Sequence, residues 1–507
     1  MIDTKVLREK ILDLAMRGKL VPQDPNDEPA SELLKRIKAE KEELIKQKKI
    51  KRDKNETEIF KGDDGLHYEK FADGTVKKLD VPYELPDGWE WAKLGSYMDV
   101  RDGTHDTPKY FDSGIPFVTS KNLGDGKIDF KNVNYISDED SQKFNQRSRV
   151  EAGDILMAMI GTIGKPVVAP KVEFEYSIKN VALFKRLTIE QNSKFIRDYL
   201  QYSEKRLRKC ASGGNQKFLS LKKLKEILIP IPPSSEQKQI VSVLSDYLSL
   251  VECIDSDQNA LQQLASQLKQ KVLDIAMQGK LVPQDPNDEP ASVLLEKIRA
   301  EKQRLYEEGK IKKKDLVETE IVKDGDNAYY QNLPDSWEIV PLKNIVNYRI
   351  GKTPNTKNKN YWTNHEGFPW ISIADMGKDK YIGRTTRKIT NKAVEEVFKG
   401  IVSPKGTLIM SFKLSIGKTN LLGKNSVHNE AIISIFPYWD NNNVLRNYLY
   451  LVLPIISNSG ETISAIKGKT LNSKKIDVLP IPLPTIREQQ EINTKVMLFL
   501  RILEIIS

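Results

Sequence analysis

The sequence has few of the residues from which proteins build metal centres or reactive thiol sites. Among 507 residues there are two cysteines and four histidines. The cysteines, Cys210 and Cys253, lack metal-ligand spacing and are expected as free thiols in a reducing cytoplasm. The histidines are scattered along the chain, so no metal-binding cluster is predicted.

Motifs of catalysis are also missing. There is no glycine-rich dinucleotide fingerprint after a strand and no nucleophile elbow. Gly351-Lys352-Thr353 imitates the end of a phosphate-binding loop, but Val346 stands where such a loop requires glycine. Asp125-Gly126-Lys127 loosely imitates a nuclease motif, and the second half of the chain does not keep its spacing. We therefore predict a chain without an active site of its own.

Long apolar runs are a third absence. No stretch reaches the ~18 apolar residues that would span a bilayer, and the first residues indicate a helix rather than a signal peptide. A cytoplasmic location is expected. The net charge of +10, with 30% charged residues, suits a polyanionic partner such as nucleic acid, although charge alone does not require one.

What the sequence does have is a long internal repeat. The segment from Gly18 to Ser31 returns letter for letter from Gly279 to Ser292. Leu-Pro-Asp-Gly-Trp89 returns as Leu-Pro-Asp-Ser-Trp337, and an Ile-Pro pair followed by Glu-Gln occurs late in both copies. Between these landmarks the copies differ widely. The chain is therefore interpreted as a duplicated constant frame that holds two variable units.

The middle of the chain has the pattern of a long helix. Neither proline nor glycine occurs from Ser234 to Gln278, and apolar residues recur at alternating spacings of three and four, which is typical of a coiled-coil seam. A helix of this length spans ~67 Å. Polar Gln258 near the midpoint would help to set the register. A single amphipathic helix packed on its own domain is the alternative. The predicted seam residues are Ile240, Leu244, Tyr247, Val251, Ile254, Leu261, Leu268, Val272 and Ile275.

The two ends of the chain together spell nearly one copy of this helix. The C-terminal segment matches its first half, and the N-terminal segment matches its second half. In the simplest geometry the ends meet, stack and lie antiparallel along the central helix, related to it by a pseudo-two-fold axis. The seam residues predicted in these segments are Leu7, Ile11, Leu14, Ile492, Val496, Phe499 and Leu503.

The repeat divides the chain into five segments. The globular units mix short β-rich runs with helices, so the predicted fold class is α+β: two α/β domains separated by a long antiparallel coiled coil, in a circular arrangement. The segments are residues 1–60 (half of the distal helix plus a charged arm), 82–233 (first domain), 234–321 (central helix plus a second charged arm), 333–484 (second domain) and 485–507 (the other half of the distal helix).

Polar loops in both units carry side chains suited to DNA. Lysine and arginine bind phosphate, and asparagine, glutamine, arginine and lysine bind base edges. Ordinary surface turns are the alternative interpretation. The candidates in the first unit are Thr104, His105, Thr107, Lys109, Thr119, Ser120, Lys121, Asn122, Lys165, Asn215, Gln216 and Lys217. Those in the second unit are Lys352, Thr353, Asn355, Lys413, Ser415, Lys418, Lys467, Lys469 and Thr470.

The motifs of the frame resemble those of the specificity subunits of type I restriction–modification enzymes. The resemblance is carried by Leu-Pro-x-x-Trp at the opening of each unit, by Ile-Pro followed by Glu-Gln at its close, and by Gly-Lys-Leu-Val-Pro-Gln and Leu-Leu-x-x-Ile-x-Ala-Glu-Lys in each arm. It covers essentially the whole chain. It implies two target-recognition domains, each reading one half of a bipartite DNA site, with a coiled coil of conserved helices that sets the spacer.

The resemblance also implies partners. Two modification subunits would hold S-adenosylmethionine and methylate adenine at N6, and restriction subunits would use ATP and Mg²⁺ to translocate and cleave. This chain would bind double-stranded DNA and no cofactor or metal. Two other functions are weighed against this one: a non-catalytic coiled-coil adaptor that binds DNA without sequence preference, and a self-sufficient nuclease or methyltransferase, which the missing motifs disfavour.

Overall fold

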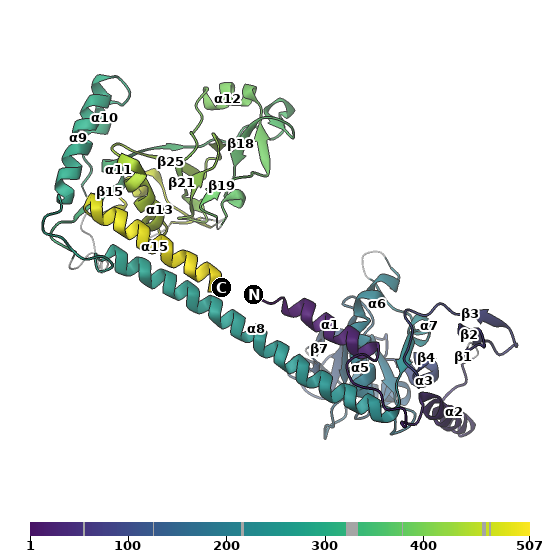
Figure 1. Ribbon diagram of the computed structural model, residues 1–507. Coiled ribbons are helices and arrows are strands. Elements are labelled where there is room, and N and C mark those ends of the chain that lie inside the picture. Colours follow the sequence, from purple (N-terminus) through teal and green to yellow (C-terminus); the bar gives the residue numbers. More distant parts are fainter. Residues whose placement is uncertain are drawn as a thin grey trace. The chain divides into compact units, whose positions relative to one another are not determined.

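The computed structural model divides the chain into two units, Met1–Gln258 and Asn259–Ser507 (Figure 1). The structure describes residues 1–53, 56–124, 126–213, 217–320, 333–377, 379–458, 463–465 and 468–506. One helix, α8 (Ser234–Met277), begins in unit 1 and ends in unit 2. Its bounds agree with the predicted helix, because two prolines precede it and Gly279, with a φ of 69°, follows it.

Unit 1 combines helices with short strands. Its other helices are α1 (Thr4–Met16), α2 (Ala30–Lys46), α3 (Leu94–Tyr97), η1 (Ser120–Asn122), α4 (Asp138–Ser148), α5 (Ser193–Tyr202), α6 (Glu204–Cys210) and α7 (Leu221–Lys225). Its strands are β1 (Glu58–Lys61), β2 (His67–Lys70), β3 (Val76–Lys78), β4 (Glu90–Lys93), β5 (Asp99–Asp102), β6 (Ile115–Thr119), β7 (Leu123–Gly124), β8 (Lys127–Ile128), β9 (Asn134–Ile136), β10 (Ile155–Ala158), β11 (Gly164–Val168), β12 (Ser177–Lys179), β13 (Val181–Lys185) and β14 (Leu228–Ile231).

The strands of unit 1 form several small sheets. The largest has the order β11-β10-β13-β5, and the next, β12-β6-β9, contains the parallel pair of β12 and β6. All four residues of β10 are buried, as are the first four of β13. Strands covered on both faces carry unbroken apolar runs, which is why the sequence indicates them clearly. Two of the polar candidate segments lie at the ends of β5 and β6.

Unit 2 repeats this plan. Its other helices are α9 (Ala291–Glu307), α10 (Lys313–Leu316), α11 (Leu342–Ile345), η3 (Lys359–Tyr361), η4 (Ile373–Asp375), α12 (Asn391–Phe398), η5 (Asn441–Asn443), α13 (Val444–Ile456), α14 (Ser473–Asp477) and α15 (Ile486–Ile506). Its strands are β15 (Glu338–Pro341), β16 (Val346–Ile350), β17 (Trp362–Thr363), β18 (Phe368–Ile371), β19 (Tyr381–Ile382), β20 (Arg387–Ile389), β21 (Leu408–Ser411), β22 (Lys413–Leu414), β23 (Thr419–Leu422), β24 (Val427–His428), β25 (Ile432–Pro437), β26 (Ile463–Ala465), β27 (Gly468–Thr470) and β28 (Pro480–Leu483).

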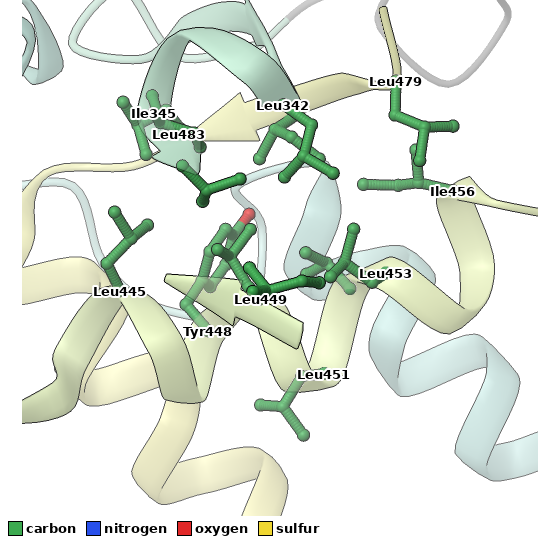
Figure 2. Packing of buried hydrophobic residues seen from close by; sticks show 14 of the residues in the cluster. Leu342, Ile345, Leu445, Tyr448, Leu449, Leu451, Leu453, Ile456, Leu479 and Leu483 are labelled. Carbon is green, nitrogen blue, oxygen red and sulfur yellow. The ribbon is translucent and has the colours of Figure 1, made fainter. Parts of the chain in front are cut away.

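The core of unit 2 surrounds α13. This helix is apolar on most of its faces and packs on α15, β21, β25 and β28, while the main sheet has the order β16-β25-β21-β23-β19. Figure 2 shows side chains of α13 facing those of α11 and β28 across a continuous apolar contact. A helix covered on all sides reads as nearly all apolar in the sequence, as α13 does. The labelled residues are Leu342, Ile345, Leu445, Tyr448, Leu449, Leu451, Leu453, Ile456, Leu479 and Leu483.

The repeated motifs of the sequence meet at one junction in each unit. In unit 1 the indole Nε1 of Trp89 donates a 2.8 Å hydrogen bond to Glu236 Oε2 at the start of α8. In unit 2 Trp337 Nε1 donates to Glu488 Oε2 over 2.9 Å, at the start of α15. Gly18 has a φ of 65°, and a Cβ there would come within 3.1 Å of the Trp89 ring. These frame residues hold each domain to its helix, which gives a physical reason for their repetition.

In unit 1, α1 runs antiparallel to α8. Ile2 N donates to Gln258 Oε1 over 2.7 Å, and Gln258 Nε2 donates to Ile2 O over 3.1 Å. Further along, Arg8 pairs with Glu252 at 3.1 Å, so residue numbers rise in α1 as they fall in α8. Gln258, which the sequence analysis singled out as a register residue, binds the backbone just before α1 begins.

In unit 2, α15 lies beside the second half of α8 and runs in the opposite direction (Figure 1). Ile492 and Val496 of α15 share one core with Leu273 and Met277 of α8. Of the predicted seam residues, Ile240, Leu244, Val251, Ile492, Val496 and Leu503 are buried. Leu7, Ile11, Leu14, Ile254, Val272, Ile275 and Phe499 are half-buried.

The predicted burial is wrong at three seam positions. The exposed fractions are 45% for Tyr247, 37% for Leu261 and 47% for Leu268. In unit 2 the buried face of α8 carries Leu273, Ala276 and Met277 instead. A straight α-helix has 3.6 residues per turn, so a seven-residue repeat drifts by ~20° per heptad, and by Leu261 and Leu268 it has rotated away from the packed face.

Candidate nucleic-acid interface

A glycine at the end of β5 positions the first candidate loop of unit 1. Gly103 N donates to Val181 O over 2.9 Å, and Thr104 N donates to Ile178 O over 3.1 Å. A Cβ on Gly103 would lie 2.4 Å from Ile178 O, closer than real Cβ atoms come. Glycine therefore allows the chain to pass the end of β12 at this point, and we call this close passage the glycine crossing. The loop that follows is held there.

Side chains of this loop make polar contacts with residues at the end of β12. His105 Nδ1 lies 2.6 Å from Asn180 Oδ1. Lys179 Nζ donates to Thr107 Oγ1 over 2.5 Å. His105, Thr107 and Lys109 are all exposed. The structure thus adds Lys179 and Asn180 to the residues that the sequence placed in this loop.

A buried carboxylate, missed by the sequence analysis, lies next to His105. Asp102, the last residue of β5, is 5% exposed. Its Oδ2 lies 3.1 Å from His105 Nε2, and its Oδ1 accepts a hydrogen bond from the Arg147 guanidinium in the last turn of α4. No local pattern joins a strand end to a helix so far along the chain, so this pair could be found only in the fold.

The segment Thr119–Asn122 lies beside the first loop, because Lys179 pairs with both Thr119 and Thr104. Asn122 is 6% exposed. Its Oδ1 accepts from Thr119 N and from Thr119 Oγ1, each over 2.9 Å, and its Nδ2 donates to a nearby carbonyl. Asn122 therefore holds the turn together from inside. Of its neighbours, Ser120 is half-buried and Lys121 is exposed.

Two further lysines of unit 1 are exposed. Lys165, in β11, has a φ of 53°, and its Nζ lies 4.0 Å from the Cβ that Gly124 would carry, so it reaches the end of the Thr119 turn. Lys217 O accepts from Gly161 N over 2.9 Å, which places Lys217 beside the loop that precedes β11. Asn215 and Gln216 lie outside the described residues.

Unit 2 has the same glycine crossing. Gly351 N donates to Ile432 O over 3.1 Å, and Lys352 N donates to His428 O over 2.9 Å. A Cβ on Gly351 would lie 2.1 Å from His428 O. Gly103 and Gly351 are therefore equivalent positions, although the residues that follow them differ.

The candidate side chains after Gly351 bind other parts of unit 2. Lys352 Nζ donates to Val397 O over 3.0 Å, and Thr353 Oγ1 donates to Glu430. Asn355 Oδ1 accepts from the backbone two residues later over 3.0 Å and so stabilises a turn. All three are exposed, and each already has a polar partner.

His428, at the base of this loop, has a structural role. It is 4% exposed, and its Nε2 lies 2.7 Å from Ser434 Oγ. Burial lowers the pKa of His428 to about 4, because the charged imidazolium would lose its hydration there. The ring is neutral at pH 7 and supports the glycine crossing from beneath.

The other candidate loops of unit 2 lie side by side. Lys413 pairs with Thr470, and Leu414 pairs with Lys469, in the sheet β22-β27-β26. The sequence placed these segments in separate loops, and the fold joins them. Ser415 is half-buried and Lys418 is exposed. Lys467 lies outside the described residues.

Two lysines of unit 1 occupy positions equivalent to those of two lysines in unit 2. Leu219 N donates to Met159 O over 2.9 Å, and Leu471 N donates to Phe412 O over 2.9 Å, so these two backbone contacts are equivalent. Lys217 and Lys469 each stand two residues before the matched leucine, and Lys165 and Lys418 each follow an Ile-Gly pair. The equivalent lysine pairs are Lys165 with Lys418 and Lys217 with Lys469.

Within the described residues, no group of three or more histidine, cysteine, aspartate or glutamate side chains could hold a metal ion. Both cysteines are exposed and unpaired with each other. Among the same residues, no helix combines the length and the apolar character needed to cross a membrane.

Comparison with known proteins gives consistent matches. The family model of the type I restriction modification DNA specificity domain matches twice, at residues 86–263 and 334–506. The specificity subunit of the Escherichia coli type I restriction enzyme EcoAI is 30% identical over 475 residues, covering 82% of this chain and 74% of that protein. The E. coli EcoEI specificity subunit is 31% identical over 410 residues, covering 69% of this chain and 63% of that protein.

The fold has a match among solved structures. A chain from a structure that describes complex assembly and conformational transition of the type I R-M system aligns with a TM-score of 0.54 at 18% identity. The alignment covers 83% of this chain and 93% of that chain. The two matched domains, the duplicated frame and the mixed helix and sheet content agree with one another. The chain belongs to the family of type I restriction–modification specificity subunits, which are non-catalytic DNA-recognition subunits.

Proposed function

We propose that each unit reads one half of a bipartite DNA site, with residues 82–233 and 333–484 as the two recognition domains. The observation that carries this proposal is the repeated crossing at Gly103 and Gly351, which presents a polar loop of different sequence at the same place in each unit. A constant scaffold with variable loops is suited to reading two different sequences in one way.

The equivalent lysines are assigned to the DNA backbone. Lys165 in unit 1 and Lys418 in unit 2 are both exposed, although the residues around them differ. Phosphates are the same at every site, so contacts to them need not differ between units, whereas contacts to bases must. Lys217 and Lys469, at the second equivalent position, are assigned the same role.

Helix α8 is assigned the role of a spacer ruler. Its 44 residues correspond to ~66 Å at 1.5 Å per residue, or roughly two turns of DNA at ~34 Å per turn. Because α1 and α15 each run antiparallel to one half of α8, we propose that they stack end to end and complete a coiled coil. The units would then bind half-sites at a set separation.

The chemistry is assigned to partner subunits. Two modification subunits with S-adenosylmethionine would methylate adenine at N6, and restriction subunits with ATP and Mg²⁺ would translocate and cleave. This chain would carry no cofactor and would act in the cytoplasm, where the chromosome lies. The EcoAI and EcoEI relatives are named as specificity subunits of restriction enzymes, which supports the assignment.

The experiment is to purify the chain with its modification subunit and select bound sequences from a library of random duplexes. A consensus of two short blocks separated by a fixed unspecified spacer would support the proposal. Binding without sequence preference would instead favour a coiled-coil adaptor. Methylation mapping of the host genome provides an independent readout of the same consensus.

Single substitutions then test the assigned contacts. Lys165→Ala and Lys418→Ala should weaken binding evenly across sequences and lower the salt dependence of log K by about one charge each. Lys413→Ala should do the same if its contact is to phosphate, and should change the consensus if its contact is to a base. Lys131→Ala, an exposed lysine outside the assigned loops, serves as the control and should leave binding unchanged.

A further inference from the structure

Unit 1 presents two exposed polar side chains anchored on one buried carboxylate. The Asp102 side chain is 7% exposed, while those of Arg147 and His105 are 64% and 58% exposed. Oδ1 of Asp102 accepts from Arg147 Nη2, and Oδ2 lies 3.1 Å from His105 Nε2. Each oxygen of the carboxylate thus holds a different side chain at the rim of the candidate loop.

The arrangement is held from several sides. Arg101 Nη1 donates to Arg147 O over 2.9 Å, which fixes the backbone at the end of α4. His105 Nδ1 is held by Asn180 Oδ1 at 2.6 Å. A guanidinium bound by a buried partner has already lost most of its rotamer freedom, so binding a ligand costs less conformational entropy. The bond to Asp102 uses Nη2, and the guanidinium keeps other N–H groups for an outside acceptor.

The second copy shows that the fold does not need these residues. The residue before Gly351 is Ile350 where unit 1 has Asp102, and the second residue after it is Thr353 where unit 1 has His105. Arg147 stands ten residues after the cap Ser137 of α4, and Gly400 stands ten residues after the cap Thr390 of α12 (147 − 137 = 400 − 390 = 10). The frame is kept and the cluster is not, so the cluster belongs to what differs between the two units.

We propose that Arg147, oriented by Asp102 and accompanied by His105, reads a guanine in the half-site bound by unit 1. The inference rests on the proposed function and names the base class and the residues that read it. Guanine presents two acceptors, N7 and O6, in the major groove, and a planar guanidinium matches them with paired donors. His105 lies next to that pair, with its two ring nitrogens held by Asp102 and Asn180. A phosphate contact by the same arginine is the competing outcome.

The test uses the full chain in complex with its modification subunit and the random-duplex selection. Arg147→Ala should lower affinity for the selected site about ten- to a hundred-fold and relax one G·C position in one block only. Arg147→Lys keeps the charge without the fork, so it should relax the same position with a smaller loss of affinity. Asp102→Asn should give an intermediate relaxation, because it removes the anchoring charge and keeps the size of the side chain.

Arg149→Ala is the matched control, because Arg149 lies two residues along, is 65% exposed and pairs with exposed Glu175. It should leave the consensus unchanged. Equal weakening on all duplexes by Arg147→Ala, with an unchanged consensus, would make the contact a phosphate contact and overturn the inference while the proposed function stands. Relaxation in both blocks, or in none, would also overturn it. A wild-type complex without a bipartite consensus would refute the proposed function itself. Melting curves identify a variant that fails to fold, and Arg147→Lys then decides.

Discussion

The junction between Trp89 and Glu236 offers a quantitative test of how the frame holds a domain to its helix. Replacing Trp89 by phenylalanine removes the indole N–H, whose 2.8 Å bond reaches the carboxylate of Glu236. Both side chains are buried, with exposed fractions of 5% and 2%. The variant keeps an aromatic ring in the core and leaves one buried carboxylate oxygen without this donor.

Two terms set the size of the effect. A hydrogen bond to a charged group contributes about 1.5–3 kcal/mol, and the smaller ring gives up roughly 1 kcal/mol of apolar burial. The expected loss is therefore about 3 kcal/mol in the free energy of opening the junction. Such a loss speeds amide exchange through local opening about a hundred-fold. The effect should be confined to the start of α8 and the strands that contact it.

The assay is hydrogen–deuterium exchange by mass spectrometry on the full chain, with peptides from residues 234–244 and 486–496. Trp89→Phe should lower protection in the first peptide. Trp337→Phe, which removes the equivalent 2.9 Å bond to Glu488, should lower it in the second. Unchanged protection of residues 234–244 in Trp89→Phe would refute the reasoning, as would an equal effect of both variants on both peptides.

Glu236, the acceptor of this hydrogen bond, should also make the stability of the junction depend on pH. Burial raises the pKa of Glu236, and the bond from Trp89 opposes that rise. A folded-state pKa above the unfolded value gives stability that is full below the unfolded pKa and is lost as pH rises through the folded pKa. Glu236→Gln keeps an acceptor and removes the charge. The free energy of unfolding of Glu236→Gln, relative to wild type, should therefore be highest at pH 7. This relative advantage should shrink as pH falls towards about 4.5, the ordinary pKa of glutamate.

Three further predictions concern the loops and the helix pair. Gly103→Ala should lower the melting temperature and abolish specific binding in one block of the site, because its Cβ would lie 2.4 Å from a backbone oxygen. The control Gly383→Ala, with no atom within 4 Å of the added carbon, should leave both properties unchanged. Gln258→Leu removes two hydrogen bonds to Ile2 and should speed exchange in the first turn of α1; unchanged exchange would rule out this role. Burial lowers the pKa of His428 from 6.5 to about 4. The stability that neutral His428 contributes is therefore present above pH 6.5 and falls by about 3 kcal/mol as pH drops towards 4. In denaturant titrations, the difference in unfolding free energy between wild type and His428→Gln should change with pH in that window and stay constant above it.

The sequence predicted the features that depend on near neighbours or on repetition. The bounds of α8 follow from flanking proline and glycine, and the starts of α2 and α9 follow from the Asn-Asp-Glu-Pro segments before them. The buried strand β10 follows from an uninterrupted apolar run, and α13 from a segment that is apolar except at Arg446 and Asn447. The repetition of Trp89 and Glu236 as Trp337 and Glu488 marked them as frame residues. Their meeting at one junction was not predicted.

The buried face of α8 was predicted only in part. Ile240, Leu244 and Val251 are buried as expected, whereas Leu268 is exposed and Leu273 takes its place. A heptad pattern assumes a partner along the full length of one stripe, but the packed domain also covers the helix from the side. Which stripe is buried depends on that domain, and no periodicity in the helix itself contains this information.

The sequence alone determined that this chain is a duplicated frame around two variable α/β units and that it belongs with type I specificity subunits. These conclusions rest on local pattern and on comparison of one half with the other. The tertiary structure decided which loop residues meet: it put Asp102 beneath His105 and Arg147, took Asn122 and His428 into the interior, and joined Lys413 to Thr470 across two strands. The reason is physical, since side-chain contacts between distant segments depend on strand register and burial, which arise only when the whole domain packs.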